Sequence, residues 1–332
     1  MRIALVGATG LVGSTMLSIL ADRKFPITGI YPVASHKSKG KVIQYDGAEY
    51  PVVSIDEAIE QRPEIALLSA GSEVSLLYAP KLATIGCQVI DNSSAWRLHG
   101  GIKLVVPEVN GSTLTKSDRI IANPNCSTIQ LVMVLEPLRR LYGIKRVVVS
   151  TYQSVSGSGN TGVAELNSQR RGSKVVNTYP HPIDLNVVPQ VDSFTDSGYT
   201  KEELKVINES RKILDDQDLA ITCTAVRVPV TTCHSESVNI ELLRDFHLDD
   251  VVMALNNFPG VTVLDDTSKG IYPFPLQAAG KDEVFVGRIR RDNSQPNTIN
   301  CWIVSDNLRK GAALNAVQIA EQFLGTGIFP RI

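Results

Sequence analysis

The sequence RIALVGATGLVG, from Arg2 to Gly13, places a short apolar run directly before three glycines. Arg2–Val6 predicts a buried strand, and the residues after the glycines predict a helix that ends near Leu20. Strand, glycine turn and helix form the unit that binds dinucleotides, because the glycines admit a tight turn, the pyrophosphate and close helix packing. The spacing is GxxGxxG rather than GxGxxG, and the alternative is a glycine-rich turn without a ligand. Its place at the start of a βα unit favours binding.

The loop after the second predicted strand, Ile27–Ala34, indicates which dinucleotide is bound. NAD-binding chains often carry Asp or Glu at this point for the ribose hydroxyls. This chain has Ser-His-Lys-Ser-Lys-Gly-Lys at 35–41, with cations and hydroxyls and no acid. Such a loop suits a 2′-phosphate and predicts NADP, although a solvated basic loop has the same composition.

Two further strands continue the first domain, at Glu64–Ser69 and Gln88–Asp91, with a helix at Val74–Leu82 between them. Open α/β sheets bind ligands at the carboxyl ends of their strands. The polar loop 92–97 follows such an end, and Arg97 is there either an anion clamp or a surface arginine.

A second motif, Asn-Pro-Asn-Cys-Ser-Thr-Ile-Gln at 123–130, joins a short strand to a helix. Pro124 keeps Asn123 out of the helical conformation, and apolar spacing predicts a helix over Ser127–Leu138. Cys126 therefore falls at the helix N-terminus, where the dipole favours a thiolate and hence a nucleophile. The alternative is a small buried residue at the start of a core helix.

The second half of the chain has a different pattern. Strands are predicted at Lys145–Gln153, Leu219–Val230 and Ser237–Leu243, with a flexible polar loop at 154–159 and a helix at Thr200–Leu214. The absence of regular βαβ alternation predicts a separate mixed α+β domain, whose sheet could also form a subunit interface. A last helix is predicted from Ala312 to Phe323.

Length and composition agree with two domains: 332 residues, 43% hydrophobic, with a net charge of −1. A charge near zero argues against a nucleic-acid or membrane-surface protein. Five widely spaced cysteines without a CxxC motif predict free thiols, no metal site and a reducing compartment, by default the cytoplasm. Met1 leads directly into a strand, and no apolar run reaches membrane-spanning length.

Five motifs together resemble the bacterial type of the aspartate-β-semialdehyde dehydrogenase family. They are GATGLVG at 7–13, NPNCSTIQ at 123–130, QSVSGSG at 153–159, RVPVTTCHSE at 227–236 and SDNLRKGAALNAVQIAE at 305–321. The resemblance implies an α/β fold: an N-terminal Rossmann-type parallel sheet and a C-terminal α+β domain like that of glyceraldehyde-3-phosphate dehydrogenase. It implies an NADP-binding domain at 1–122, to which a helix at 307–326 returns. The domain at 123–306 would serve catalysis and dimerisation in a homodimer or homotetramer.

The resemblance also implies roles for single residues. Cys126 resembles the nucleophile, His234 its acid/base, and Gln153 the residue that orients the bound intermediate. Contacts to the substrate are implied for Arg227 with the carboxylate, Glu202 with the ammonium, and Lys205 and Arg97 with phosphate. Each has a structural alternative: His234 a structural histidine, Arg227 a buried ion-pair member, and Glu202 with Lys205 an ordinary helix-surface pair.

The predicted cofactor-binding residues extend over both domains. They are Gly7, Thr9, Gly10, Leu11, Val12, Gly13, Ser35, Lys37, Ser38, Ser69, Ala70, Gly71, Ser156, Gly157, Gly159 and Asn307. Lys37 stands where many relatives carry arginine, so a planar fork becomes a point charge and the preference for NADP is weakened.

The implied reaction is the reversible, NADP-dependent reductive dephosphorylation of aspartyl 4-phosphate to aspartate semialdehyde through a Cys126 thioester. It serves the biosynthesis of lysine, threonine, methionine and diaminopimelate. One alternative is an N-acetyl-glutamyl-phosphate reductase, which has no need of an ammonium-binding Glu202. The other is a non-catalytic paralogue, against which the intact Cys126, Gln153, Arg227 and His234 argue.

Overall fold

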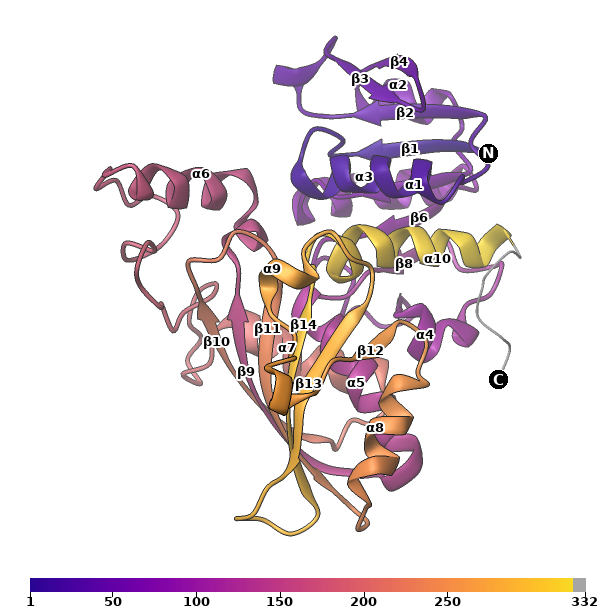
Figure 1. Cartoon of the computed structure of the whole chain (residues 1–332). Coiled ribbons are helices and arrows are strands. Elements are labelled where there is room, and N and C mark those ends of the chain that lie inside the picture. Colours follow the sequence, from indigo (N-terminus) through magenta and orange to yellow (C-terminus); the bar gives the residue numbers. More distant parts are fainter. Residues whose placement is uncertain (325–332) are drawn as a thin grey trace. The chain divides into compact units, whose positions relative to one another are not determined.

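The computed structural model describes residues 1–324, which form two compact units (Figure 1). Unit 1 contains residues 1–124 and 312–324, and unit 2 is Asn125–Gly311. The chain therefore passes back to unit 1 at residue 312, not at the predicted residue 307, because 307–311 pack within unit 2. Residues 325 and 326 of the predicted last helix lie outside the described residues. Over residues 1–324, no helix has the length and apolarity needed to cross a bilayer.

Unit 1 is built on a parallel sheet with the strand order β2-β1-β5-β6-β8-β7. Its strands are β1 (Arg2–Val6), β2 (Gly29–Val33), β5 (Ile65–Leu68), β6 (Gln88–Asp91), β7 (Lys103–Leu104) and β8 (Ile120–Ala122). The chain adds strands first on one side of β1 and then on the other, so a crevice opens beyond the carboxyl end of β1. The predicted Rossmann-type sheet is confirmed.

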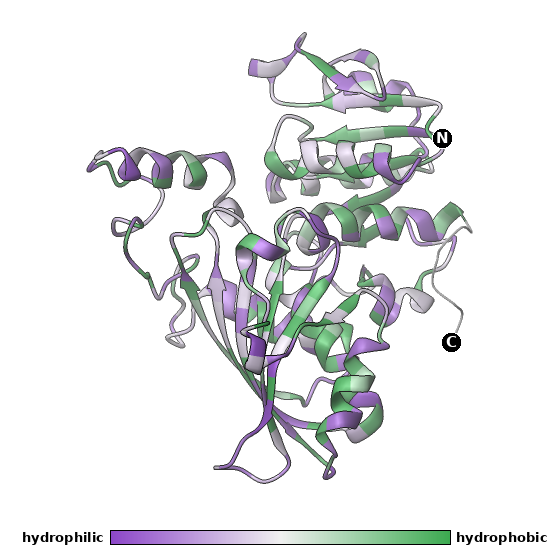
Figure 2. Cartoon of the chain, viewed as in Figure 1, coloured by the Kyte–Doolittle hydropathy of each residue, from purple (hydrophilic) through white to green (hydrophobic). Residues whose placement is uncertain are grey.

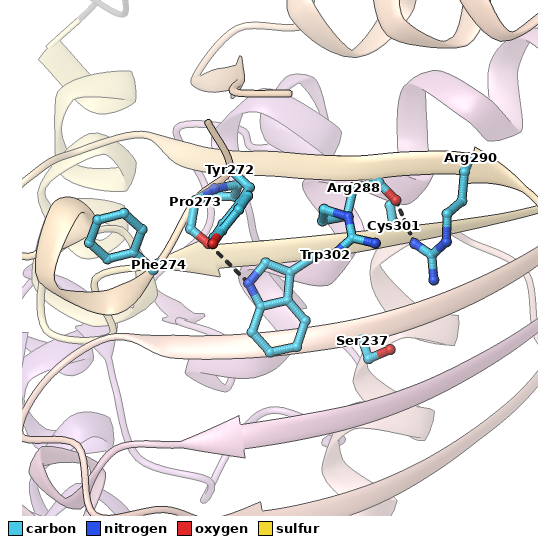
Figure 3. A pocket seen from close by; sticks show the side chains of 8 residues that line it. All are labelled: Ser237, Tyr272, Pro273, Phe274, Arg288, Arg290, Cys301 and Trp302. Carbon is cyan, nitrogen blue, oxygen red and sulfur yellow. Dashed lines mark hydrogen bonds between the residues drawn. The ribbon is translucent and has the colours of Figure 1, made fainter. Parts of the chain in front are cut away.

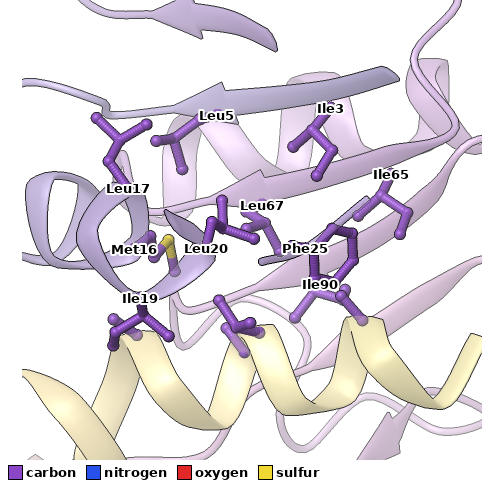
Figure 4. Packing of buried hydrophobic residues seen from close by; sticks show 14 of the residues in the cluster. Ile3, Leu5, Met16, Leu17, Ile19, Leu20, Phe25, Ile65, Leu67 and Ile90 are labelled. Atoms are coloured by element: carbon purple, nitrogen blue, oxygen red, sulfur yellow. The ribbon is translucent and has the colours of Figure 1, made fainter. Parts of the chain in front are cut away.

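The core of unit 1 lies between this sheet and its helices. These are α1 (Leu11–Asp22), α2 (Ile55–Glu60), α3 (Ser72–Thr84), α4 (Pro107–Asn110) and α10 (Leu314–Leu324). Figure 4 shows Met16 and Ile19 of α1 beside the yellow helix α10, under β1. Because Leu314 and Val317 of α10 are in the same buried cluster, the last helix completes this core. A hairpin that the sequence did not predict, β3 (Val42–Tyr45) with β4 (Ala48–Pro51), adds Tyr45 to it.

Unit 2 has a mixed sheet with the order β10-β9-β11-β14-β13-β12. Its strands are β9 (Ile144–Gln153), β10 (Ala220–Arg227), β11 (His234–Leu242), β12 (Val261–Val263), β13 (Val284–Arg291) and β14 (Thr298–Ser305). The helices are α5 (Cys126–Tyr142), α6 (Gly159–Arg170), α7 (Lys201–Ile213), α8 (Leu248–Asn256) and α9 (Pro275–Ala278). Helix α5 packs on β9, β11 and β14, and most of its residues from Ile129 to Leu138 are apolar in Figure 2. The predicted α+β domain is confirmed.

The prediction of a flexible loop at 154–159 is wrong. Val155–Ser158 form a short 3₁₀ turn that leads directly into α6, and both Val155 and Ser156 are buried. Val155 packs in an apolar cluster with Leu166 and Tyr179, and its N–H donates to Val230 O. The polar, glycine-rich sequence has no helical or strand period, so these long-range contacts could not be foreseen.

Candidate active site

Cys126 is the first residue of α5, and its position is held by its neighbour Asn125. Asn125 caps the helix because its Oδ1 accepts the N–H groups of Ser127 at 3.0 Å and Thr128 at 3.3 Å. Its own N–H donates to Glu209 Oε2 at 2.6 Å, and its Nδ2 donates to Glu202 Oε1 at 2.8 Å. Asn125 thus ties the start of α5 to α7. Cys126 lies at the N-terminus of α5, where the helix dipole stabilises an anion.

The other four cysteines differ from Cys126 in burial. Cys126 is partly exposed, whereas Cys87, Cys223, Cys233 and Cys301 are buried. Burial raises the pKa of Cys87 and of Cys301 to about 12, and it also raises the pKa of Cys223 and of Cys233. These four therefore stay protonated at neutral pH, and Cys126 is the cysteine that solvent and a substrate can reach.

Three predicted site residues lie in one row across the sheet of unit 2. Arg227 at the end of β10 pairs with Gln153 at the end of β9. His234 at the start of β11 pairs with Ser305, and the β11–β9 register continues to the level of Gln153. All three side chains are buried, at 5%, 1% and 0% exposure, and the guanidinium of Arg227 donates to Ser154 O at 2.6 Å. Strand register therefore gathers residues that are up to 81 positions apart in the sequence.

Glu202 links this row to the start of α5. Its Oε1 accepts both Gln153 Nε2 at 3.1 Å and Asn125 Nδ2 at 2.8 Å. Its Oε2 accepts Lys205 Nζ at 3.3 Å, and Lys205 also reaches Asp192 at 2.8 Å. Glu202 is 5% exposed, so the pair is not an ordinary solvated helix-surface pair.

His234 is held in one tautomer. The N–H of Ser154 donates to His234 Nδ1 at 3.1 Å, and since a backbone N–H can only donate, the proton of the neutral ring is on Nε2. Burial, with the charge of Arg227, lowers the pKa of His234 to about 3. Nε2 is buried without a hydrogen-bond partner among the described residues. The ring thus presents a neutral Nε2–H that is free to meet a reacting group.

Two glycines allow close approach to these side chains. A Cβ on Gly157 would lie 2.9 Å from Arg227 Nη1 and 3.2 Å from His234 Cε1. A Cβ on Gly311 would lie 3.0 Å from Cys126 Cβ. Any side chain at these positions would press on Arg227, His234 or Cys126. Gly159, in contrast, has open space at its Cβ and a positive φ of 72°, so its requirement is conformational.

Unit 1 contains a cavity of about 690 Å³ beyond the carboxyl ends of β1 and β2. The predicted cofactor residues that line it are Gly7, Thr9, Gly10, Ser35, Ser69 and Ala70. Outside the lining are Leu11, Val12, Gly13, Lys37, Ser38 and Gly71. Gly13 instead permits helix packing, because a Cβ there would lie 2.2 Å from Gly7 O. His36, Lys39, Ser54, Asp56 and Tyr78 also line the cavity, and none was in the predicted set.

The basic lining of this cavity comes from Lys39 and not from Lys37. The short 3₁₀ turn His36–Ser38 buries Ser38 and leaves Lys37 exposed outside the cavity. Lys39 lines the cavity and pairs with Glu57 at 2.8 Å. Two lysines in one basic loop could not be told apart by composition, because the turn decides which of them faces the cavity.

Three predicted residues remain to be placed, and they are Arg97, Ser156 and Asn307. Arg97 is buried in unit 1, where its Nη2 donates to Asn92 O at 2.7 Å. Ser156 and Asn307 are buried in unit 2 and hydrogen-bond each other, with Asn307 Nδ2 donating to Ser156 Oγ at 2.9 Å.

Glu236 was not among the predicted residues, although it lies two positions after His234 on the same face of β11. Its side chain has no exposed surface, and Gln130 on α5 faces it. The groups around it from β10 and β14 are the thiols of Cys223 and Cys301, which carry no charge. Burial raises the pKa of Glu236 well above its ordinary value, so the side chain is a neutral acid in the folded protein.

Glu236→Gln is expected to stabilise the protein increasingly as the pH rises. The folded state keeps a proton that the unfolded state has released above its pKa near 4.5. Wild-type stability therefore falls by about 1.4 kcal/mol per pH unit between the unfolded and the folded pKa, and glutamine does not titrate. Urea unfolding of both proteins at pH 5, 6.5 and 8 measures the difference. The exposed Glu60→Gln is the control, and a pH-independent difference for Glu236→Gln would contradict the neutral acid.

The parallel Rossmann-type sheet with its cavity and the separate mixed sheet of unit 2 define a two-domain dehydrogenase. Residues 2–117 match the family model described as semialdehyde dehydrogenase, NAD binding domain, and residues 135–310 match semialdehyde dehydrogenase, dimerisation domain. The chain belongs to the semialdehyde dehydrogenase family.

Relatives of known name are similar over the whole chain. Aspartate-semialdehyde dehydrogenase of Aquifex aeolicus is 46% identical, covering 98% of this chain and 99% of its own. The Bacillus subtilis enzyme of that name is 47% identical, covering 97% and 96%. The crystal structure of aspartate semialdehyde dehydrogenase II from Vibrio cholerae, complexed with ASA, has a TM-score of 0.94 at 42% identity and covers 99% of both chains.

Proposed function

We propose that this chain is an aspartate-semialdehyde dehydrogenase that interconverts aspartyl 4-phosphate and aspartate semialdehyde. One observation carries the proposal: Glu202 Oε1 accepts from both Asn125 and Gln153. This link connects the residue that caps α5, next to Cys126, to Gln153, which pairs with Arg227 in the sheet. A thiol, a proton donor, a cationic clamp and an acidic clamp are the groups that an amino-acid acyl phosphate requires.

In the biosynthetic direction, the Cys126 thiolate attacks the acyl carbon, and the carbon–oxygen bond to phosphate breaks. The dipole of α5 and the Asn125 cap stabilise the thiolate and the charge that develops on the carbonyl oxygen. Gln153, held by Glu202 and Thr151, would orient the bound intermediate. The product is a thioester on Cys126 and free phosphate.

NADPH held in the unit 1 cavity, which Gly7, Gly10 and Lys39 line, would supply the hydride that reduces the thioester. The carbonyl oxygen becomes an alkoxide, which accepts a hydrogen bond from His234 Nε2–H and shares its proton. When the carbon–sulfur bond breaks, the proton stays on His234, Cys126 leaves as a thiolate and the aldehyde is released. A substrate carboxylate on Arg227 would offset the charge that lowers the pKa of His234, so substrate binding and the proton donor are coupled.

The acidic clamp distinguishes aspartate from acetylated substrates. We propose that the carboxylate of Glu202 receives the substrate ammonium, while Lys205 and Arg97 bind phosphate. Lys205 already pairs with Glu202 and Asp192. Phosphate beside Lys205 would offset the repulsion between its ammonium and that of the substrate.

Turnover assays test this assignment. The wild type should form NADPH from aspartate semialdehyde only when phosphate is present, and it should reject N-acetylglutamate semialdehyde. Glu202→Gln should raise the KM for aspartate semialdehyde strongly, since an unpaired ammonium in a buried site costs several kcal/mol. Efficient use of the acetylated aldehyde would move the chain to the N-acetyl-glutamyl-phosphate reductases, and an inactive wild type would support a non-catalytic paralogue.

Lys39→Gln is expected to raise the KM for NADP about 10-fold and to leave the KM for NAD nearly the same, because a charged hydrogen bond to the 2′-phosphate is lost. Lys39 lines the unit 1 cavity, whereas Lys37 is exposed outside it. Lys37→Gln should therefore have the smaller effect. Steady-state kinetics with both cofactors decide, and equal changes for NADP and NAD would remove Lys39 from the phosphate contact.

We further propose that a second copy of the chain covers the outer face of the unit 2 sheet. Figure 3 shows Trp302 and Ser237 below a segment that carries Tyr272 and Phe274, and Trp302 Nε1 donates to Pro273 O at 3.1 Å. Tyr272 and Phe274 are 43% and 44% exposed, and Leu276 is 88% exposed. So much exposed apolar surface favours an interface. A monomer in sedimentation equilibrium at micromolar concentration would contradict this.

A further inference from the structure

Asn307 is a buried amide whose hydrogen-bonding groups are used within unit 2. Its Oδ1 accepts Cys233 N–H at 2.9 Å, Ser154 Oγ at 3.1 Å and Ser156 Oγ at 3.2 Å. Its Nδ2 donates to Ser156 Oγ at 2.9 Å, and the side chain is 4% exposed. Three of these four bonds use Oδ1, so a cofactor contact through this atom would compete with the bonds that hold residues 154, 156 and 233.

The first partner, Cys233, controls the direction of the chain before His234. Cys233 has a φ of +71°, a left-handed conformation that is strained for a non-glycine residue. It sends the Cys233 side chain into the cluster of Phe285 and Val304, while His234 turns to the site. The bond from Cys233 N–H to Asn307 Oδ1 stabilises this turn.

The second partner, Ser154, contacts the imidazole itself. Its N–H donates to His234 Nδ1, and its Oγ lies 3.2 Å from the same atom. The Ser154 hydroxyl also donates to Asn307 Oδ1, so its proton points away from the ring. Asn307 thereby holds the residue whose N–H fixes the tautomer of the ring.

We propose that Asn307 is a positioning residue for His234, which it orients through the backbone of Cys233 and the hydroxyl of Ser154. The inference rests on the proposed function, in which His234 Nε2–H donates to the developing alkoxide. Asn307 thereby joins two segments that are distant in sequence, 154–156 and 232–234, behind one imidazole. The prediction that Asn307 binds cofactor concerns a different role, and the two roles have different kinetic consequences.

The kinetic test compares three variants. Asn307→Ala should lower kcat about 10–100-fold, the scale known for outer-shell partners, with less than about 3-fold change in the KM for NADP. Asn307→Asp keeps an acceptor for Ser154 and Cys233 and adds a negative charge, so it should restore part of kcat and shift the acidic limb of the pH profile to higher pH. Thr232→Val, which removes two long contacts of 3.4 Å to Asp306 and Asn307, should stay within about 2-fold of wild type.

A second readout does not depend on turnover. Histidine-selective ¹⁵N NMR of the wild type should show one neutral imidazole with its proton on Nε2, which does not titrate near pH 6.5. In Asn307→Ala the resonances of Nδ1 and Nε2 should shift toward the values expected for a mixture of the two tautomers. If Asn307→Ala fails to fold, the test is whether Asn307→Asp moves the acidic limb of the pH profile to higher pH.

An unchanged kcat and an unchanged histidine spectrum, with a raised KM for NADP, would overturn the proposal and leave Asn307 as a cofactor contact. The spectrum also separates this inference from the proposed function. A wild type without activity on aspartate semialdehyde would contradict the function, whereas a tautomer that responds to Asn307 would still support the positioning.

Discussion

Cys126→Ser is expected to lower turnover by about 10⁴-fold or more while leaving the fold and NADPH binding intact. Serine keeps the size of the side chain, so the helix start that Asn125 caps is preserved. Its hydroxyl stays protonated where a thiol can ionise, and the acyl intermediate would be an ester that accepts hydride less readily. Single-turnover kinetics and NADPH fluorescence titration measure the two properties on the same preparation.

A buried cysteine supplies the control for this experiment. Cys301→Ser should retain kcat within a few-fold, because burial raises the pKa of Cys301 to about 12 and keeps it from acting as a nucleophile. No other cysteine can replace Cys126 for the same reason. Near-wild-type turnover of Cys126→Ser would contradict covalent catalysis, and a variant that does not fold would return Cys126 to a structural role.

His234→Asn is expected to lower kcat about 10²–10⁴-fold at saturating substrate, the usual worth of a positioned acid or base. The amide of asparagine can still accept from Ser154 N–H, but it cannot exchange a proton with the intermediate. A loss confined to KM would assign His234 to binding instead. Gln130→Glu is not a suitable control, because it would place a second acid beside Glu236.

The pH dependence gives a second check on His234. Because burial and Arg227 lower its pKa to about 3, the ring is neutral in the free enzyme over the working range. The profile of kcat/KM for the wild type should therefore have no inflection from His234 near pH 6.5. The unfolded ring gains a proton below pH 6.5 and the folded ring does not. The free energy of unfolding of the wild type therefore decreases by about 1.4 kcal/mol for each unit by which the pH is lowered from 6.5 toward 3. His234→Asn should lose this contribution.

Several elements could be predicted from the sequence because their determinants are local. The glycines at 7, 10 and 13 predict the first βα unit, and the structure shows why, since a Cβ at Gly7 would lie 2.3 Å from Ser69 O. The helix predicted at Thr200–Leu214 is α7, with Thr200 as its N-cap and Glu203 completing a capping box. Periodicity and capping depend on residues a few positions apart, so they can be recognised in the sequence without the tertiary structure.

Relations between distant segments could not be predicted in this way. The motif at 123–130 indicates Cys126, but the hydrogen bonds of Glu202 to Asn125 and Gln153 arise only when α7 packs beside α5 and β10. The sequence pairs Glu202 with Lys205 by helical spacing, which the 3.3 Å contact agrees with, yet it does not show that Glu202 is buried.

The sequence by itself determined the Rossmann unit, the α5 helix with Cys126 at its start, and the family to which the chain belongs. Tertiary structure alone decided that Arg227, Gln153 and His234 share one row, because strand register depends on how whole strands pair. It also decided that Lys39 lines the cavity in place of Lys37, and that Glu236 is a neutral acid. The exposure and the pKa of a side chain depend on the residues that the fold packs around it. Composition and residue spacing do not show which residues those are.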